Sequence, residues 1–355
     1  MTIARHVAPA AAATDGRLRL PAPLPVAEAG FTPGGPLPEV VANGARPVLL
    51  RGFVRHWPVV AAAKEGPGAL RAYLARFDAG ASVTVTVGDP SLRGRVFYDR
   101  AMTGPNVPSG RAPIGEVLAR VTRHGAEPDP PLIYLASTSA DECLPGFRAE
   151  NDVPFGARDP LVSVWFGTRT RIAAHNDLPR NLACVAAGRR RFTLFPPDQT
   201  PNLYPGPIEN TPAGRPVSMV DFAAPDLERF PRFAEAMAHA QVAELEAGDA
   251  LFVPSMWWHH VEATAGVNLL VNYWWRTVPA HLGTPQDALN HAILSIRDLP
   301  EDEKAIWRDA FDHYVFGDPA LPRAHLPEHA HGMLGEMTPE RARRVRAYLL
   351  NRLNR

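Results

Sequence analysis

Lysine is nearly absent from this chain: Lys64 and Lys304 are the only two, and arginine supplies almost all of the positive charge. Basic and acidic side chains number 37 each, so no charge excess favours binding to nucleic acid or an anionic membrane. Cys143 and Cys184 lie far apart without a Cys-x-x-Cys pair or a zinc-type spacing, which indicates a reducing compartment and no obvious nucleophile. No apolar run is long enough for a signal peptide or a membrane span, and we therefore expect a soluble, cytoplasmic protein.

The pattern of apolar residues predicts a mainly β protein with flanking helices. The 355 residues suffice for one large domain or two ordinary ones. Upstream of residue 160, strands are expected at 46–50, 82–87 and 132–136, and helices at 68–77 and 113–124. From 161 to 275, short apolar runs alternate with Pro, Gly, Asp and Asn turns, at 162–166, 181–186, 191–195 and 267–275. Such punctuation favours a sandwich or barrel of the cupin or jelly-roll kind.

The two ends of the chain differ from this middle part. Residues 1–35 are rich in Pro, Ala and Gly and are expected to form a loosely ordered arm. Residues 36–279, with a core at 160–276, are expected to form the main domain. Residues 280–355 are expected to be helical, at 287–296, 301–315 and 338–353, and the last helix begins with a Thr-Pro pair that suits an N-cap and N1.

His175 and Asp177 form a His-x-Asp pair, and His259 follows much later in the chain. Alternate residues of an extended strand point the same way, so the pair can share one metal ion while a histidine from a distant strand completes three ligands. Two histidines and one carboxylate leave open positions that suit ferrous iron, an oxidant and a chelating co-substrate. A His-x-Asp pair alone is more often a surface turn, but here a turn at 246–249 and an apolar strand at 250–254 precede the later histidine.

Strand alternation distinguishes His259 from its neighbour His260. His259 shares a face with Val261 and Ala263, whereas His260 shares a face with Glu262. Because the apolar face should point inward, we predict that His259 is the metal ligand.

The same alternation directs Arg190 inward with Phe192 and Leu194. A buried arginine needs an anion, and a dicarboxylate co-substrate would provide one; an internal acidic residue or a frayed strand are the alternatives. Asn272 and Trp274 likewise share a face. A buried asparagine needs hydrogen-bond partners, which either a bound carboxylate or a neighbouring strand could supply.

Residues 172–275 carry a series of ordered matches to a known family. The matching residues are His175-x-Asp177, Asn181, Gly188-x-Arg190-Arg191, Leu194-Phe195-Pro196-Pro197-Asp198-Gln199, Leu203-Tyr204-Pro205, Val220-Asp221-Phe222, Pro225-Asp226, Glu228-Arg229-Phe230-Pro231, Gly248-Asp249, Pro254, Trp257-Trp258-His259-His260 and Val271-Asn272-Tyr273-Trp274. On these residues the chain resembles the Jumonji-C (JmjC) and cupin-like 2-oxoglutarate oxygenases, with the strongest likeness to the asparaginyl hydroxylase group that includes factor inhibiting hypoxia-inducible factor. Weaker likeness extends upstream to residues 47–50, 97–99 and 132–135.

The resemblance implies a double-stranded β-helix with iron held by His175, Asp177 and His259. It also implies a set of 2-oxoglutarate-binding residues: Asn181 and Asn272 at the metal-proximal end, Tyr134 and Arg190 at the distal carboxylate, and Trp274 beside Asn272. Two positions depart from the family. Arg190 stands where the asparaginyl hydroxylase has lysine, and Ile172 stands where the family usually has a threonine that helps to hold the same carboxylate. Since arginine is longer and forked, the co-substrate site should be remodelled.

The reaction implied is oxidative decarboxylation of 2-oxoglutarate coupled to hydroxylation of a protein side chain or an amino-acid-like substrate. The alternatives are an oxygenase acting on a small metabolite, a metal-binding cupin without oxygenase activity, and a zinc hydrolase. The family also implies a homodimer joined by C-terminal helices. An apolar stripe on the last helix fits that implication, although such a stripe can also pack on its own domain: Ala342, Val345, Leu349 and Leu353.

Overall fold

The computed structural model describes residues 20–33, 35–209, 211, 212 and 214–354. The chain divides into two compact units, Met1–Trp275 and Arg276–Arg355.

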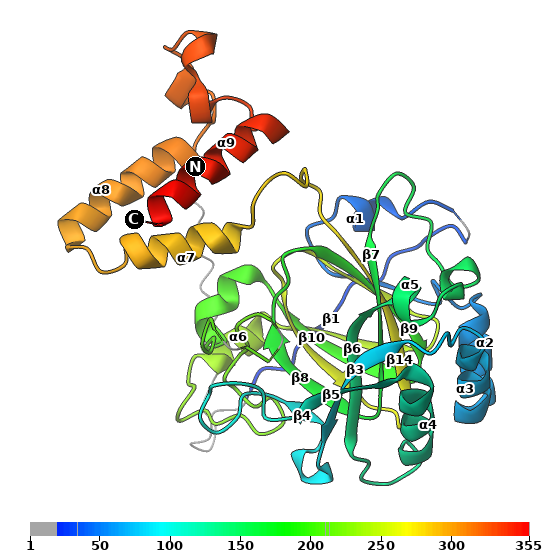
Figure 1. Cartoon of the computed structure of the whole chain (residues 1–355). Helices are drawn as coiled ribbons and strands as arrows, with labels where there is room; N and C mark the ends of the chain where they lie inside the picture. Colours follow the sequence, from blue (N-terminus) through cyan, green and yellow to red (C-terminus); the bar gives the residue numbers. More distant parts are fainter. Residues whose placement is uncertain (1–19, 34, 210, 213, 355) are drawn as a thin grey trace. The chain divides into compact units, whose positions relative to one another are not determined.

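The first unit is built on two β-sheets (Figure 1). Within the described residues, one sheet has six strands in the order β1-β11-β10-β13-β8-β4, and the other has eight in the order β2-β12-β9-β14-β7-β6-β3-β5. The strands are β1 Leu24–Pro25, β2 Val48–Leu50, β3 Ser82–Gly88, β4 Arg95–Val96, β5 Ser109–Pro113, β6 Leu132–Ser139, β7 Leu161–Gly167, β8 Thr170–His175, β9 Arg180–Ala187, β10 Arg189–Phe195, β11 Gln241–Glu246, β12 Ala250–Val253, β13 Trp258–Ala263 and β14 Asn268–Trp275.

Strands β7 to β14 alternate between the sheets along the chain, except that β10 and β11 both lie in the smaller one. Strands β8, β10, β11 and β13 lie in the smaller sheet, and β7, β9, β12 and β14 lie in the larger one. This distribution confirms the predicted cupin or jelly-roll fold, and the strands expected at 162–166, 181–186, 191–195 and 267–275 are present. An apolar layer fills the space between the sheets, and it includes Phe192, Leu194, Val261 and Leu270. Burial of each such side chain contributes about 1.5–3 kcal/mol.

Helices cover the outer faces of both sheets. The larger sheet is covered by α1 Glu39–Ala42, α2 Pro58–Glu65, α3 Pro67–Ala75, α4 Ile114–His124 and α5 Ala140–Cys143. The smaller sheet is covered by α6 Phe233–Ala238 and the segment before it, and Figure 1 shows α6 on the opposite side of the unit from α2 and α3. Strand β9 is therefore buried on both of its faces from Asn181 onward.

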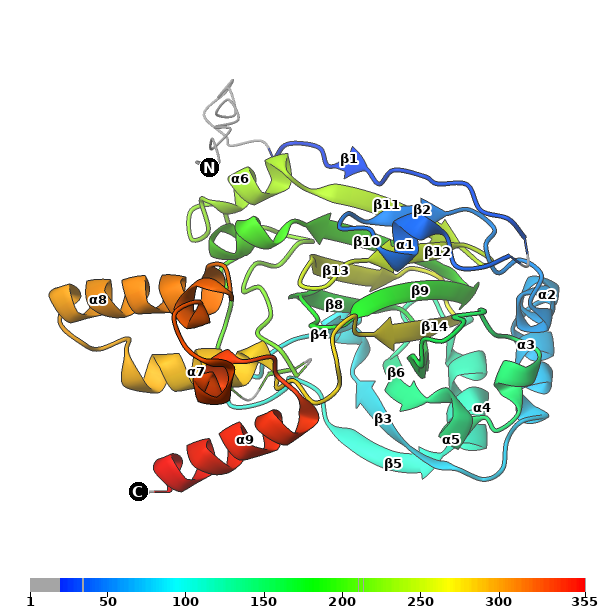
Figure 2. The ribbon, with the colours of Figure 1, turned by 90° about the horizontal axis from the view of Figure 1, so that it is seen from above.

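The N-terminal segment is partly paired with the sheet. Residues 1–19 and 34 of the arm expected at 1–35 lie outside the described residues. In the described part, Leu24–Pro25 pairs in parallel with Gln241–Val242, along the outer edge of the smaller sheet in Figure 2. Val26 is buried there. This stretch is thus fixed by backbone hydrogen bonds, because the sheet edge supplies partners that composition does not reveal.

The second unit contains three longer helices, α7 Pro285–Ser295, α8 Glu301–Phe311 and α9 Pro339–Leu353. The hydroxyl of Thr338 accepts a hydrogen bond from the Arg341 N–H at 3.2 Å, and Pro339 follows at N1, as the Thr-Pro pair predicts. The expected helix at 301–315 is α-helical only to Phe311 and continues as a π-helical turn at Asp312–Phe316. Among all described residues, no helix has both the length and the hydropathy needed to cross a bilayer.

Candidate active site

Two neighbouring strands bring His175 and His259 together. His175 ends β8, His259 lies in β13, and the two residues pair directly in the antiparallel ladder. The ligand atoms of His175, Asp177 and His259 all lie within 4.8 Å of one another. In the part of the chain that the structure describes, this is the one group of histidine, cysteine and acidic side chains arranged to hold a metal ion.

Backbone carbonyls determine which histidine nitrogen is available. Nδ1 of His175 lies 2.9 Å from the Ala173 carbonyl, and Nδ1 of His259 lies 3.0 Å from the Trp257 carbonyl. A carbonyl can only accept, so each Nδ1 must carry the proton and each Nε2 presents a lone pair. Nε2 of His259 lies 3.5 Å from Oδ2 of Asp177. Two imidazole nitrogens and one carboxylate form a set of ligands that suits ferrous iron. Each imidazole is oriented by the hydrogen bond from its Nδ1 to a backbone carbonyl.

The charges of this group also suit a metal cation. Burial, reinforced by His259, lowers the pKa of His175 to about 4, so its imidazole is neutral at neutral pH. Burial acts to raise the pKa of Asp177, but the neighbouring His259, His175 and Arg215 outweigh it and leave that pKa at about 2. The neutral imidazole of His175 and the carboxylate of Asp177 are therefore ready to bind a cation without losing protons.

Asp177 lies beyond the end of β8, which stops at His175. Strand alternation was the basis for predicting that His175 and Asp177 point the same way, but Asp177 is not in the strand, and other contacts must position it. The backbone N–H of Met256 donates to the Asp177 carbonyl at 2.8 Å. Arg215 donates to the backbone carbonyl of Asn176 at 3.3 Å and to its side-chain oxygen at 3.1 Å. Loop contacts from distant parts of the chain thus hold this ligand, and no spacing in the sequence indicated Arg215.

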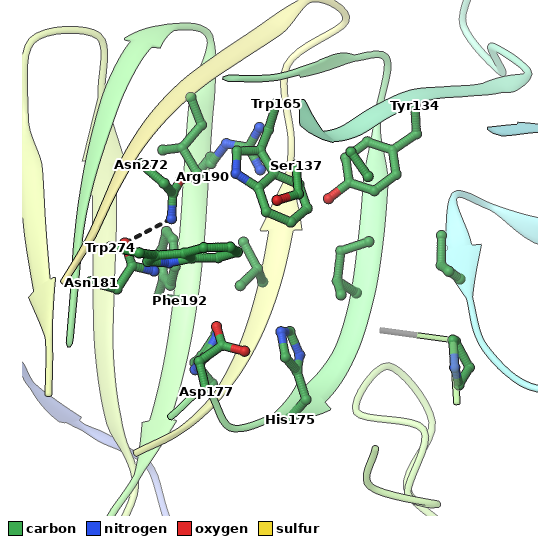
Figure 3. A pocket seen from close by; sticks show the side chains of 17 residues that line it. Tyr134, Ser137, Trp165, His175, Asp177, Asn181, Arg190, Phe192, Asn272 and Trp274 are labelled. Carbon is green, nitrogen blue, oxygen red and sulfur yellow. Dashed lines mark hydrogen bonds and ion pairs between the residues drawn. The ribbon is translucent and has the colours of Figure 1, made fainter. Parts of the chain in front are cut away.

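A cavity of about 260 Å³ opens between the sheets beside these residues (Figure 3). All the residues predicted from the sequence to bind metal or co-substrate line it: Tyr134, His175, Asp177, Asn181, Arg190, His259, Asn272 and Trp274. Apolar side chains form much of the remaining wall, including Val96, Ile172, Phe192, Val261 and Leu270.

Arg190 is buried in the wall of the cavity, with 2% of its surface exposed. Its Nε has no hydrogen-bond partner, and the guanidinium forms no ion pair with another described residue. Burial lowers the pKa of Arg190 to about 10, with only a partial offset from Tyr134. The sequence left two alternatives to anion binding, an internal acidic partner and a frayed strand. Neither holds within the described residues, because no acidic side chain pairs with Arg190 and β10 is regular there. Arg190 is thus a cation that has no counter-ion among the described residues, in the wall of the cavity.

Two amides lie on the same wall. The Nδ2 group of Asn272 donates to Oδ1 of Asn181 at 2.7 Å, while Oδ1 of Asn272 has no partner (Figure 3). A neighbouring strand therefore supplies only some of the hydrogen-bond partners that Asn272 needs. One polar atom of this buried side chain is unpaired among the described residues.

His260 points away from the cavity, as strand alternation predicts. Its ring stacks on Phe222, with centroids 4.5 Å apart and planes inclined by 22°. Burial and the positive charge of Arg171 lower its pKa to about 3. His260 is therefore a neutral side chain in the layer that covers the smaller sheet.

Among the cavity residues that were not identified from the sequence, two carry hydrogen-bonding groups in their side chains, Ser137 and Trp165. Ser137 lies at an irregularity of β6 between Leu135 and Thr138 and has a φ of 34°. Trp165 lies in a run that is apolar on both faces, so alternation could not orient it. Its pairing with Leu270 places it on the face of β14 that also carries Asn272, and that pairing is visible only in the sheet.

The chain is similar to several proteins of known family. It is 33% identical to lysine-specific demethylase JMJ31 of Arabidopsis thaliana over 127 residues, 34% of this chain and 23% of that protein. It is 36% identical to HSPB1-associated protein 1 of Homo sapiens over 166 residues, 44% of this chain and 32% of that protein. It is 28% identical to bifunctional peptidase and (3S)-lysyl hydroxylase JMJD7 of Homo sapiens over 259 residues, 65% of this chain and 77% of that protein.

The first two alignments span only about a quarter to a third of those relatives. They support the JmjC and cupin-like family as a whole, and the stronger likeness to asparaginyl hydroxylases is still a prediction. The family model described as Cupin-like domain matches residues 37–281, well over half of the chain. The jelly-roll fold, the His-Asp-His group and the extent of this match show that the chain belongs to the Cupin-like domain family, with JmjC proteins among its relatives.

Proposed function

We propose that this protein is an Fe(II)- and 2-oxoglutarate-dependent dioxygenase. One observation carries the proposal: an open His-Asp-His group shares a cavity with Arg190, a buried cation that has no acidic partner among the described residues. A zinc hydrolase would use the same three ligands but would leave the buried charge of Arg190 unexplained. A dicarboxylate keto acid accounts for the metal-ligand group and for Arg190, because one end can chelate the metal while the other pairs with the guanidinium.

Iron, when bound, would supply the oxidative chemistry that converts 2-oxoglutarate and dioxygen to succinate and carbon dioxide while a substrate C–H becomes C–OH. His175, Asp177 and His259 would hold the metal through two Nε2 atoms and a carboxylate oxygen. Asn181 and Asn272 would contact the keto-acid end. Tyr134 and Arg190 would bind the distal carboxylate, and apolar side chains such as Val261 would exclude water from the cavity.

A protein side chain is the substrate class that we favour. Two relatives are named for action on lysine, one as a lysine-specific demethylase and one as a (3S)-lysyl hydroxylase. The balanced charge of this chain gives no support to a nucleic-acid substrate. An amino-acid-like metabolite would present the same kind of C–H bond and is the second candidate.

We also propose that the protein is a homodimer joined by its C-terminal helices. Within the described residues of the second unit, only Pro322 and Ala342 are buried. Large apolar side chains are exposed on α9, with Leu349 at 43% and Leu353 at 54%. The first turn of α8 is acidic and α9 is rich in arginine. Apolar surface beside complementary charges suits association with a second copy of this chain.

The decisive experiment is to incubate the iron-loaded protein with 2-oxoglutarate, ascorbate and dioxygen and to follow succinate by NMR. Slow succinate formation without a prime substrate is expected, and it should disappear in Asp177→Ala. A parent protein that binds iron but neither binds nor consumes 2-oxoglutarate would overturn the proposal in favour of a metal-binding cupin without oxygenase activity.

A further inference from the structure

Trp165 presents a buried hydrogen-bond donor that has no acceptor. Its indole Nε1 has no hydrogen-bond partner in the described part of the chain, although the side chain lines the cavity. Leaving such a group unpaired in a protein interior costs about 1–3 kcal/mol. The structure therefore indicates that something outside the described chain accepts this hydrogen bond, either water or a ligand.

Trp165 and Arg190 line the same cavity, as does Tyr134. In the view of Figure 3, both side chains are drawn at the end of the cavity away from His175 and Asp177, and Tyr134 is drawn beyond Trp165. The side chains come from opposite sheets, since Trp165 is on β7 and Arg190 is on β10. Hydrogen-bond donors from both sheets thus line one cavity. A ligand with an acceptor group would pair with them there.

Aromatic neighbours hold this indole in position. The ring of Trp165 lies 5.9 Å from that of Tyr134, at an interplanar angle of 33°. On its other side it meets the ring of Trp274 edge-on, with centroids 6.0 Å apart and an angle of 73°. A side chain packed between two rings loses little further freedom when it donates to a ligand.

We infer that Trp165 donates its indole N–H to the distal carboxylate of the keto-acid co-substrate, alongside Arg190 and Tyr134. The inference rests on the proposed function and adds a residue to it. A carboxylate has two oxygens and about four lone-pair positions, so it can accept from all three donors. Ile172, which also lines the cavity, has no hydroxyl to offer. Trp165 thereby makes the site specific for a dicarboxylate over a keto acid with an apolar tail.

The test uses Trp165→Phe, which keeps an aromatic ring and removes the N–H. Binding is measured by calorimetry on the iron-loaded protein without oxygen, for 2-oxoglutarate and for 2-oxopentanoate, which has a methyl group in place of the distal carboxylate. We expect Trp165→Phe to weaken 2-oxoglutarate binding about tenfold, the value of one hydrogen bond to a charged acceptor, and to change 2-oxopentanoate binding less than twofold.

Trp275→Phe is the matched control. Its Nε1 is also buried without a partner, but its ring packs against Phe155 and Phe252 on the outer face of the sheet. This variant should bind both keto acids as the parent does. If the parent binds 2-oxoglutarate and Trp165→Phe binds it equally well, the role of Trp165 is wrong. If the parent does not bind 2-oxoglutarate, the proposed function itself fails.

A second measurement does not depend on the folding of Trp165→Phe. In the zinc-loaded parent labelled with ¹⁵N-tryptophan, the seven indole N–H signals can be assigned by single Trp→Phe variants, with Trp165 by elimination if necessary. Its signal should move downfield on addition of 2-oxoglutarate and not of 2-oxopentanoate. An unmoved Trp165 signal in protein saturated with 2-oxoglutarate would overturn the inference.

Discussion

Asn272 donates a side-chain hydrogen bond to Asn181 at 2.7 Å, which joins β14 to β9 in the wall of the cavity. The bond fixes the orientation of both amides, because Nδ2 of Asn272 must face Oδ1 of Asn181. It leaves Oδ1 of Asn272 without a hydrogen-bond partner among the described residues, so that a ligand in the cavity can use it.

Replacement of Asn272 by alanine should therefore affect both stability and co-substrate binding. We expect a loss of about 1–3 kcal/mol in the free energy of unfolding, because the buried Asn181 is left unpaired, and about tenfold weaker 2-oxoglutarate binding. Urea unfolding and calorimetry measure the two effects. Asn268→Ala is the control: this residue of the same strand is buried away from the cavity, where it bonds to Ala265 and Thr168. It should lower stability without changing the affinity.

Removal of a metal ligand should abolish iron binding. We expect His175→Ala, Asp177→Ala and His259→Ala each to weaken Fe(II) binding more than about 100-fold, since even residues that only orient ligands contribute 10–100-fold. His260→Ala should retain iron, because that ring stacks on Phe222 outside the cavity. Iron content after anaerobic dialysis is the measurement. Loss of iron in His260→Ala together with its retention in His259→Ala would contradict the assignment.

Arg190 should be required for binding of the co-substrate and not for binding of iron. Charged hydrogen bonds contribute roughly 1.5–3 kcal/mol each, so Arg190→Met should weaken 2-oxoglutarate binding at least about tenfold. Arg190→Lys should recover part of the loss, because the charge is kept and the forked geometry is not. Anaerobic titration of the charge-transfer absorbance reports the affinity. If Arg190→Met binds 2-oxoglutarate as tightly as the parent, Arg190 does not bind the distal carboxylate.

His260 should make the metal-free protein sensitive to acid. Its pKa is about 3 in the fold, chiefly because of burial, against an ordinary value of 6.5. As the pH falls below 6.5 the unfolded chain takes up a proton that the folded chain excludes, so stability declines by about 1.4 kcal/mol per pH unit. His260→Phe should lose about 2 kcal/mol less than the parent between pH 7 and 5 in urea unfolding. Parallel declines in the two proteins would show that another group is responsible.

The proposed dimer should depend on the apolar surface of α9. Leu349→Glu combined with Leu353→Glu places two charges on exposed positions of that helix. We expect the parent to have twice the monomer mass by light scattering and the double variant to be monomeric, with little change in the thermal stability of the first unit. Arg100→Glu, an exposed change of the same net charge outside the C-terminal helices, controls for charge alone and should remain dimeric. A monomeric parent would remove the proposal.

Much of the fold was predictable from the sequence, because strands and helices have local periods. Alternation along β10 and β13 was enough to direct Arg190 and His259 toward the interior and His260 away from it. The apolar runs and turn residues between 161 and 275 were enough to predict the jelly roll. Such features depend on neighbours one or two residues away, and these neighbours are visible in the sequence.

The tertiary structure alone decided how the cavity is completed. Asp177 is held beyond the end of its strand by Met256 and Arg215, which are distant in the chain. Trp165 and Arg190 line one cavity only because β7 pairs with β14 in one sheet while β10 lies in the other. The physical reason is the same in both cases: side-chain identity and local period determine which way a residue points, whereas pairing and loop contacts across the fold determine what it meets.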